Sequence, residues 1–276
     1  MRIISDTATL YSPTEGQQMD VTILPVYVNV DGVEYRDYED IDSEGFLEMI
    51  NAGGVPSSSQ PSIGDMMDAL EESREEVLVL AIGDGLSGAY QNAVGAKNSI
   101  DDNEYIHVLD TKTLAGPHRY LLNKAIKMRA EGFGIEKIKE ELQRCIESSI
   151  SFVIPADFEF LKRSGRLTPI AATIGGLIKI VPVMTQTADR KRIEPFAIKR
   201  SFKKALDAII NHLKEKGIDE SYIISIGHAG VVEKAEGIIM QMKEAFEHAT
   251  VELLQLSPSL ITHGGPGCVT IQVIKK

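Results

Sequence analysis

Residues 77–88, Val-Leu-Val-Leu-Ala-Ile-Gly-Asp-Gly-Leu-Ser-Gly, decide how the first half of the chain is interpreted. The run from Val77 to Ile82 is apolar throughout, which is typical of a strand buried on both faces of a parallel sheet. The glycine-rich loop 83–88 follows this run, and a helical pattern begins near Ala89. The order of strand, loop and helix predicts one unit of an α/β fold.

Two more segments repeat this unit. Residues 2–4 lead into Ser5-Asp6-Thr7, and residues 106–109 lead into Asp110-Thr111-Lys112-Thr113 and a further helical pattern. Loops at the carboxyl ends of parallel strands gather in one crevice, where ligands bind. The first half therefore predicts a parallel sheet with several small polar loops at one site.

The pattern changes near residue 150, where we place the boundary between an N-terminal domain, residues 1–150, and a C-terminal α/β domain, residues 151–276. The apolar run from Ile170 to Met184 predicts a buried helix that passes into a strand. The other elements expected after the boundary are a strand at 152–154, a helical turn from Phe158, a hairpin tip at 190–192, a helix from Ser201, a strand at 222–226, a helix from Val232 and a strand at 268–274.

The composition is that of a folded globular protein, with 43% hydrophobic and 25% charged residues among 276. The sequence contains neither an apolar stretch of about 18 residues nor a signal-peptide pattern, so we expect a cytoplasmic protein without stable membrane insertion. Cys145 and Cys268 are too few for a disulfide framework and are expected to be buried. The net charge of −11 argues against nucleic acid as a partner.

The charge is unevenly distributed. Residues 162–204 contain eleven Lys and Arg against Asp189 and Glu194, which gives +9, so the rest of the chain carries −20. A cationic segment on an acidic protein suits a small anion or an acidic partner surface. The same residues also fit a solvated helix and hairpin face.

The loop 83–88 matches G-x-G-x-x-G after a strand and before a helix, the pattern that cradles a dinucleotide pyrophosphate. This supports an NAD(P)-dependent oxidoreductase as an alternative. Asp84 disfavours that reading because it places a negative charge beside the pyrophosphate. Backbone N–H groups at the helix start, together with the Ser87 hydroxyl, suit any small oxyanion, including a carboxylate.

Two other polar segments are candidates for the site. Residues 57–62, Ser-Ser-Ser-Gln-Pro-Ser, offer a hydroxyl cluster before a helix, and Ser62 alone also fits a plain N-cap. His263 stands in the Gly/Pro-rich turn 263–268, where an imidazole is displayed or merely structural. The histidines show no metal-ligand spacing, so no metal is expected.

These segments, in this order, resemble the DegV family of bacterial proteins over nearly the whole chain. The residues that carry the resemblance are Ser5-Asp6-Thr7-Ala8, Ser58-Ser59-Gln60-Pro61-Ser62, Gly85-Leu86-Ser87-Gly88-Ala89-Tyr90, Leu109-Asp110-Thr111 with Gly116, Phe160-Leu161-Lys162-Arg163-Ser164-Gly165-Arg166-Leu167, Arg200 and His263-Gly264-Gly265-Pro266-Gly267.

The resemblance implies a two-domain fold, with a Rossmann-like parallel-sheet domain followed by an α/β domain and a long-chain fatty acid in a tunnel between them. It implies that the protein is a lipid carrier rather than an enzyme, with no catalytic residue and no cofactor. Its partner would be the ATP-binding subunit of a fatty acid kinase, which phosphorylates the bound acid. The implied carboxylate ligands are Ser58, Ser59, Ser87, Gly88 and His263, and the residues implied in head-group handling or kinase docking are Arg166, Arg200 and His263.

Several positions depart from the family pattern. Ser58 replaces a common threonine and keeps the hydroxyl, whereas the hydroxyls usual at other positions of the head-group motifs are lost. The positions that lose them are Gly83, Asp84, Ala89 and Gly265. The run 170–180 is a candidate tunnel wall, with Gly175-Gly176 making room, and it fits ordinary helix packing equally well. A third reading keeps the fold and places another amphiphile in the tunnel.

Overall fold

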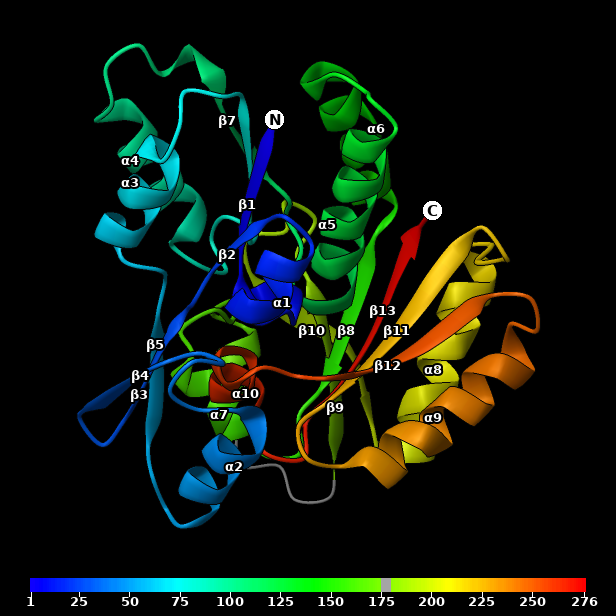
Figure 1. Cartoon of the computed structure of the whole chain (residues 1–276). Coiled ribbons are helices and arrows are strands. Elements are labelled where there is room, and N and C mark those ends of the chain that lie inside the picture. The colour runs from blue at the N-terminus through cyan, green and yellow to red at the C-terminus, as the bar shows by residue number, and fades with distance from the viewer. Residues whose placement is uncertain (175–179) are drawn as a thin grey trace.

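The computed structural model describes residues 1–174 and 180–276. Within these residues, the strands form a four-stranded, a six-stranded and a three-stranded sheet (Figure 1). The predicted α/β class with a parallel sheet in the first half is confirmed. In the run 170–184, the predicted strand is confirmed as β9 (Val181–Gln186), whereas the predicted buried helix is wrong where the structure describes it: Ala171–Thr173 is a single short 3₁₀ turn and Ile170 is 77% exposed. Gly175 and Gly176 lie outside the described residues.

The first sheet is parallel, in the order β2-β1-β6-β7. Its strands are β1 (Arg2–Asp6), β2 (Thr22–Leu24), β6 (Val77–Ala81) and β7 (Ile106–Asp110). Every side chain of β6 is buried, as its continuous apolar run predicts. The chain order reverses between β1 and β6, so the loops that follow these two strands diverge and leave a crevice.

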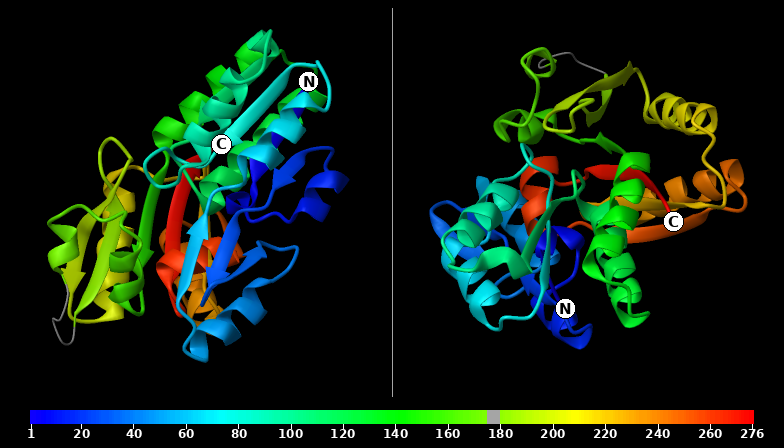
Figure 2. Two further views of the ribbon diagram at one scale, coloured as in Figure 1. Left: turned by 90° about the vertical axis from the view of Figure 1, so that its left-hand side faces the viewer. Right: turned by 90° about the horizontal axis from the view of Figure 1, so that it is seen from above.

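Helices cover both faces of the first sheet. One face packs against α3 (Ile63–Glu71) and α4 (Ala89–Asn98). The other packs against α5 (Ala115–Ala130) and α6 (Ile135–Ser148), and this core extends to Ile274 of the second sheet. Helices α5 and α6 therefore lie between the two large sheets (Figures 1 and 2).

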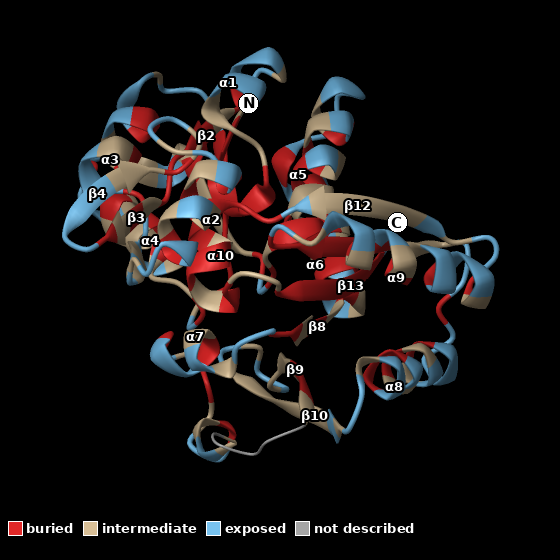
Figure 3. Cartoon of the chain, turned by 90° about the horizontal axis from the view of Figure 1, so that it is seen from below, coloured by how far each residue is buried: buried red, intermediate tan, exposed pale blue. Residues whose placement is uncertain are grey.

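The second sheet has the order β10-β9-β8-β13-β11-β12. Its strands are β8 (Ile150–Ile154), β9 (Val181–Gln186), β10 (Ile193–Lys199), β11 (Tyr222–His228), β12 (Thr250–Gln255) and β13 (Val269–Lys275). Its far face packs on α8 (Phe202–Glu215) and α9 (Val232–Ala245), whose outer faces are exposed, whereas β13 is buried at the centre (Figure 3). The predicted hairpin tip 190–192 joins β9 to β10.

The proposed domain boundary at residue 150 coincides with the first residue of β8. Because α5 also packs against β11 and β13, the two halves share a core as well as a boundary. Both cysteines are buried and free, as expected. Within the described residues, every helix is too short or too polar to span a bilayer.

A three-stranded antiparallel sheet lies beside the first sheet, and sequence patterning did not predict it. It consists of β3 (Tyr27–Val30), β4 (Val33–Arg36) and β5 (Pro56–Ser59), in the order β4-β3-β5. It packs against α10 (Pro258–Gly264), which belongs to the C-terminal end of the chain, while α2 (Ser43–Asn51) packs on the other side of α10. The remaining short elements are α1 (Pro13–Gln18), α7 (Phe158–Arg163) and 3₁₀ turns at Thr7–Thr9 and Asn103–Tyr105.

Candidate functional site

A small polar cavity, called here the hydroxyl chamber, lies at the carboxyl ends of β1 and β6. Its volume is about 50 Å³, on a scale where one water molecule needs roughly 10–15 Å³. Three elements supply most of its hydroxyls: β5, the loop after β6 and α10. The residues that line it are Ala8, Val26, Ser58, Ser59, Gln60, Ile82, Leu86, Ser87, Arg166, Ser259, Leu260 and His263.

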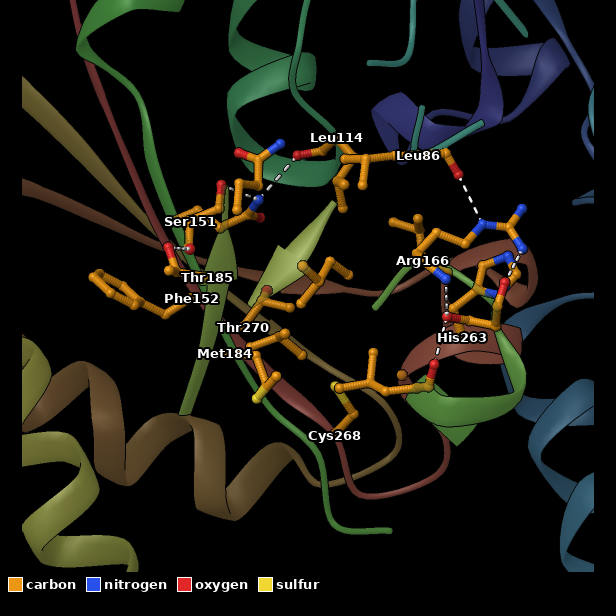
Figure 4. Close-up of a pocket in the computed structure, with 18 of the residues that line it drawn as sticks. Leu86, Leu114, Ser151, Phe152, Arg166, Met184, Thr185, His263, Cys268 and Thr270 are labelled. Atoms are coloured by element: carbon orange, nitrogen blue, oxygen red, sulfur yellow. Dashed lines mark hydrogen bonds between the residues drawn. The ribbon is translucent and has the colours of Figure 1, made fainter. Parts of the chain in front are cut away.

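A second cavity, called here the apolar chamber, adjoins the first and has a volume of about 110 Å³. Apolar side chains from both halves of the chain form most of its wall, including Leu114, Leu161, Met184 and Leu256 (Figure 4). Five residues line both chambers, so one layer of side chains separates them. These shared residues are Ile82, Leu86, Arg166, Leu260 and His263.

Arg166 is the shared residue that carries charge. Its Nε donates to the carbonyl oxygen of Leu86 at 3.0 Å, and its guanidinium also donates to the carbonyl oxygen of Ser164. Burial lowers the pKa of Arg166, although an arginine stays charged at neutral pH. Within residues 1–174 and 180–276, no carboxylate lies within ion-pair distance of it. A half-buried cation without an anion is costly, so the junction favours an anionic ligand.

His263 lies in the last turn of α10, not in the open turn that the sequence predicted. Its Nε2 is 2.8 Å from the Ser58 Oγ, 205 positions earlier in the chain. Burial and the charge of Arg166 lower the pKa of His263 to about 3, so the ring is neutral. When Nε2 carries the proton and donates to Ser58, the Ser58 hydroxyl is free to donate to an anion. The pair can therefore hold a carboxylate without adding charge.

Ser87 presents a second hydroxyl to the same chamber. Its Oγ accepts the N–H of Ala89, the first residue of α4, at 3.2 Å, and this contact fixes the side chain. The hydroxyl proton has no acceptor within the part of the chain that the structure describes, so it can be donated to a ligand. Ser87, Ser58 and Arg166 thus supply donors from three separate elements to one small cavity.

Ser58 and Ser59, predicted as part of a hydroxyl cluster before a helix, lie on strand β5, and helix α3 follows. Ser58 pairs with Val28 of β3, and this pairing directs its side chain toward α10. The alternative role of Ser62 as an N-cap is confirmed, because its Oγ accepts the N–H of Asp65 at 3.0 Å. Ser59 also lines the hydroxyl chamber.

The structure places two of the predicted site residues outside the chamber walls. Gly88 lies against Gln60, and a Cβ at this position would be 2.9 Å from the Gln60 Oε1. Arg200 is exposed in the turn between β10 and α8, apart from the residues that line either chamber. Its predicted role in docking stays a prediction.

The glycines that replace family hydroxyls have local packing reasons. Gly265 takes a positive φ of 78° to end α10, and a Cβ there would lie 2.6 Å from the Phe160 ring. A Cβ at Gly83 would lie 3.0 Å from the Lys112 backbone. The loss of hydroxyls at these positions therefore accompanies close packing in this chain.

The glycine loop 83–88 is closed over by the hairpin between β9 and β10. A Cβ at Gly85 would lie 2.8 Å from the Lys191 carbonyl oxygen, and Lys191 Nζ is 2.9 Å from the Asp84 carboxylate. The pair lowers the pKa of Asp84 through the hydrogen bond from Lys191. These contacts cover the loop at Gly85 and place a carboxylate within it, so the geometry gives no support to the oxidoreductase alternative.

Ser259 and Leu260 are site residues that sequence reasoning missed. They belong to α10, which begins with Pro258 at its first turn after Ser257. A Ser-Pro pair after a strand is a recognised helix start and could have located this element. The described residues also contain no group of three His, Cys, Asp or Glu side chains that could hold a metal ion.

The fold and the two chambers define an α/β protein with a polar and an apolar cavity side by side at the switch point of its parallel sheet. Comparison with known proteins gives the family. The family model described as an uncharacterised protein of the DegV family matches residues 1–276, and the chain belongs to this family.

Relatives of known sequence and structure agree. The DegV domain-containing protein SA1258 of Staphylococcus aureus (strain N315) is 27% identical over 278 residues, covering 99% of this chain and 98% of that protein. A DegV family protein from Thermus thermophilus, described as fatty acid binding, superposes with a TM-score of 0.89 at 25% identity over the full length of both chains. The fatty acid binding DegV family protein SAG1342 from Streptococcus agalactiae gives 0.88 at 28% identity, covering 100% of this chain and 98% of that one.

Proposed function

We propose that this protein binds one long-chain fatty acid, with the carboxylate in the hydroxyl chamber and the acyl tail in the apolar chamber. The observation that carries the proposal is Arg166, a cation without a carboxylate partner in the described residues, placed where the two chambers meet. The solved relatives described as fatty acid binding share this fold over the whole chain.

The energetics of the two chambers are complementary. Burial of one CH₂ group is favourable by about 0.8 kcal/mol, so about fourteen of them supply roughly 11 kcal/mol before ordering costs. The tail therefore provides the affinity. Ser58, Ser87 and Arg166 need only orient the carboxylate, which lets one carboxylate oxygen remain available for chemistry.

The most direct test is mass spectrometry of an organic extract of the protein purified from a bacterial host. The expected result is a fatty acid in a near 1:1 ratio with the protein. An empty extract, with no uptake of added hexadecanoic acid in isothermal titration, would rule out fatty acid binding.

The proposal includes a partner, the ATP-binding subunit of a fatty acid kinase. In that reaction a carboxylate oxygen of the bound acid attacks the γ-phosphorus of ATP, the bond to the β–γ bridging oxygen breaks, and ADP leaves. The products are ADP and an acyl phosphate. The carrier supplies no catalytic residue or cofactor; it presents the carboxylate, and its cationic segment 162–204 suits an acidic face of the partner.

The partner role is tested by reconstitution with such a kinase subunit and by measurement of acyl phosphate formation. Arg200→Ala and His263→Ala are each expected to retain hexadecanoic acid while phosphorylation falls at least about tenfold. Normal turnover of both variants would exclude their role in presentation, whereas failure of the wild-type pair to phosphorylate any bound acid would exclude the kinase partnership.

A further inference from the structure

The far end of the apolar chamber lies at a place where two strands of the second sheet part. The ladder between β8 and β9 consists, within the described residues, of the pairs Phe152–Thr185 and Val153–Met184. Both strands continue beyond it, β8 back to Ile150 and β9 forward to Gln186. The backbone ladder therefore ends at a seam beyond Phe152 and Thr185, where one side-chain hydrogen bond, from Thr185 Oγ1 to the Ser151 carbonyl oxygen at 2.9 Å, joins the two strands.

The side chains at this seam line two cavities at once. Ser151, Thr185 and Gln186 line the apolar chamber, and they also line an outer cleft of about 490 Å³. The cleft is bounded by the C-terminal ends of α6 and α8 and by residues 187–190. In Figure 4, Ser151 and Thr185 lie at the end of the chamber opposite to Arg166 and His263. The seam is thus one layer of side chains thick and distal to the proposed carboxylate site.

The seam is polar and has unused hydrogen-bonding capacity. Ser151 Oγ accepts from Gln272 Nε2 at 3.0 Å, and its own proton has no acceptor in the described part of the chain. Gln186 Nε2 donates to the Lys112 carbonyl oxygen at 3.1 Å, which leaves the Gln186 Oε1 as an acceptor. One donor and one acceptor therefore belong to residues that line the same two cavities, and together they offer what a hydroxyl group needs.

We infer that the apolar chamber opens at this seam into the outer cleft and that the protein accepts acyl chains whose far end carries a hydroxyl group. The inference rests on the proposed fatty acid binding and specifies its substrate class. The terminal hydroxyl would accept from Ser151 and donate to Gln186, while the methylene chain fills the apolar chamber and the carboxylate lies near Arg166.

The test is calorimetric titration of the protein, stripped of lipid, with saturated fatty acids of 12 to 18 carbons and with their ω-hydroxy counterparts. At one chain length or more, the ω-hydroxy acid is expected to bind within about threefold of the unsubstituted acid. A sealed apolar end would bury the hydroxyl unpaired and weaken binding by about tenfold to a hundredfold. A penalty above tenfold at every length would overturn the inference.

Variants separate the seam from general effects on the fold. Gln186→Leu and Ser151→Ala are each expected to lower the affinity for the ω-hydroxy acid about five- to tenfold more than the affinity for hexadecanoic acid, measured on the same variant. Gln241→Leu, on the exposed face of α9, is the matched control and should change neither. If the seam variants lose affinity equally for both classes of acid, the seam has no role in specificity. If neither class binds the wild-type protein, the proposed function fails first, and the two failures are distinguishable.

Discussion

The hydroxyl chamber and the apolar chamber share a wall but are built in opposite ways. The hydroxyl chamber collects short side chains from β5, the loop after β6 and α10, segments that are far apart in the sequence. The apolar chamber takes most of its wall from the second sheet and from α7 and α10, with aliphatic side chains such as Leu161, Met184 and Leu260 and a polar end at Ser151 and Gln186. The difference indicates that orientation of the ligand and affinity for it are separable, and the predictions below test that separation.

Filling the apolar chamber should have the largest effect. Leu114→Trp places a larger side chain in a half-buried position of the chamber wall. It is expected to lower the affinity for hexadecanoic acid and for 1-hexadecanol alike by more than about a hundredfold, because the space that the tail needs is filled. Calorimetry or displacement of a fluorescent fatty acid measures this loss. Leu47→Trp, in a different cleft, is the control. Retained binding of either ligand by Leu114→Trp would place the tail elsewhere.

Removal of the charge at the junction should distinguish acid from alcohol. Arg166→Leu is expected to lower the affinity for hexadecanoic acid about thirtyfold and to leave the affinity for 1-hexadecanol within threefold. The difference is expected because hydrogen bonds to charged groups contribute about 1.5–3 kcal/mol. Arg163→Leu is the matched control, because Arg163 lies over the Phe160 ring outside both chambers. Equal losses for the two ligands would show that Arg166 acts through packing rather than through charge.

Removal of one neutral donor should have a smaller effect. Ser87→Ala is expected to lower the affinity for hexadecanoic acid about three- to tenfold, because a single hydrogen bond contributes about 1 kcal/mol. Ser57→Ala, an exposed serine on β5 that lines neither chamber, should have no effect. A bulky replacement, Ser87→Phe, should abolish acid binding by filling the hydroxyl chamber, and unchanged binding would remove Ser87 from the site.

The smallest effect on binding, but a clear one on stability, should come from a carboxyl group behind the hydroxyl chamber. Asp37 accepts from Thr7 Oγ1 at 2.8 Å, and burial raises its pKa to about 7. Between about pH 4 and pH 7, the Asp37 carboxyl group is protonated in the folded state and ionised in the unfolded state. Asp37 therefore stabilises the fold at low pH, and this contribution to the free energy of unfolding is lost as pH rises toward 7. Asp37→Asn should therefore gain stability relative to wild type between pH 5 and pH 8, by at least about 1 kcal/mol.

Denaturant unfolding of the two proteins at pH 5, 6.5 and 8 measures this difference. His118 and His263 change the free energy of unfolding with pH in the opposite direction. Burial lowers the pKa of each to about 3, so the neutral ring stabilises the fold above pH 6.5. Their contribution is lost as pH falls from 6.5 toward 3. A difference between Asp37→Asn and wild type that stays constant with pH would mean that Asp37 titrates normally in the fold.

The sequence predicted those elements whose local residue pattern matches their surroundings in the fold. Strand β6 is an apolar run that is buried on both faces, and β1 and β7 each contain a shorter apolar run followed by a polar loop, so these loops could be placed at one edge of a parallel sheet without a structure. Ser87 and its loop followed from that placement.

The remaining site depended on contacts between distant segments. Strand β5 reads Pro-Ser-Ser-Ser and has no β-branched residue, and it is a strand because it pairs with β3. The Ser58–His263 hydrogen bond joins residues 205 positions apart, which no local period can indicate. The error at Ile170 has the same origin, because an apolar run alone does not reveal which of its residues are covered.

The hydrogen bond from Arg166 to the Leu86 carbonyl oxygen also has a kinetic consequence. It links residues 80 positions apart at the junction between the chambers, so under the proposed function a fatty acid that spans both chambers would pass beside a contact between the two halves of the chain. Exchange at this end would wait for local opening of that contact rather than for diffusion. Residence time, and not only affinity, would determine what the protein carries: it would keep the lipid it last loaded through purification and release it quickly only when something parts Arg166 from Leu86.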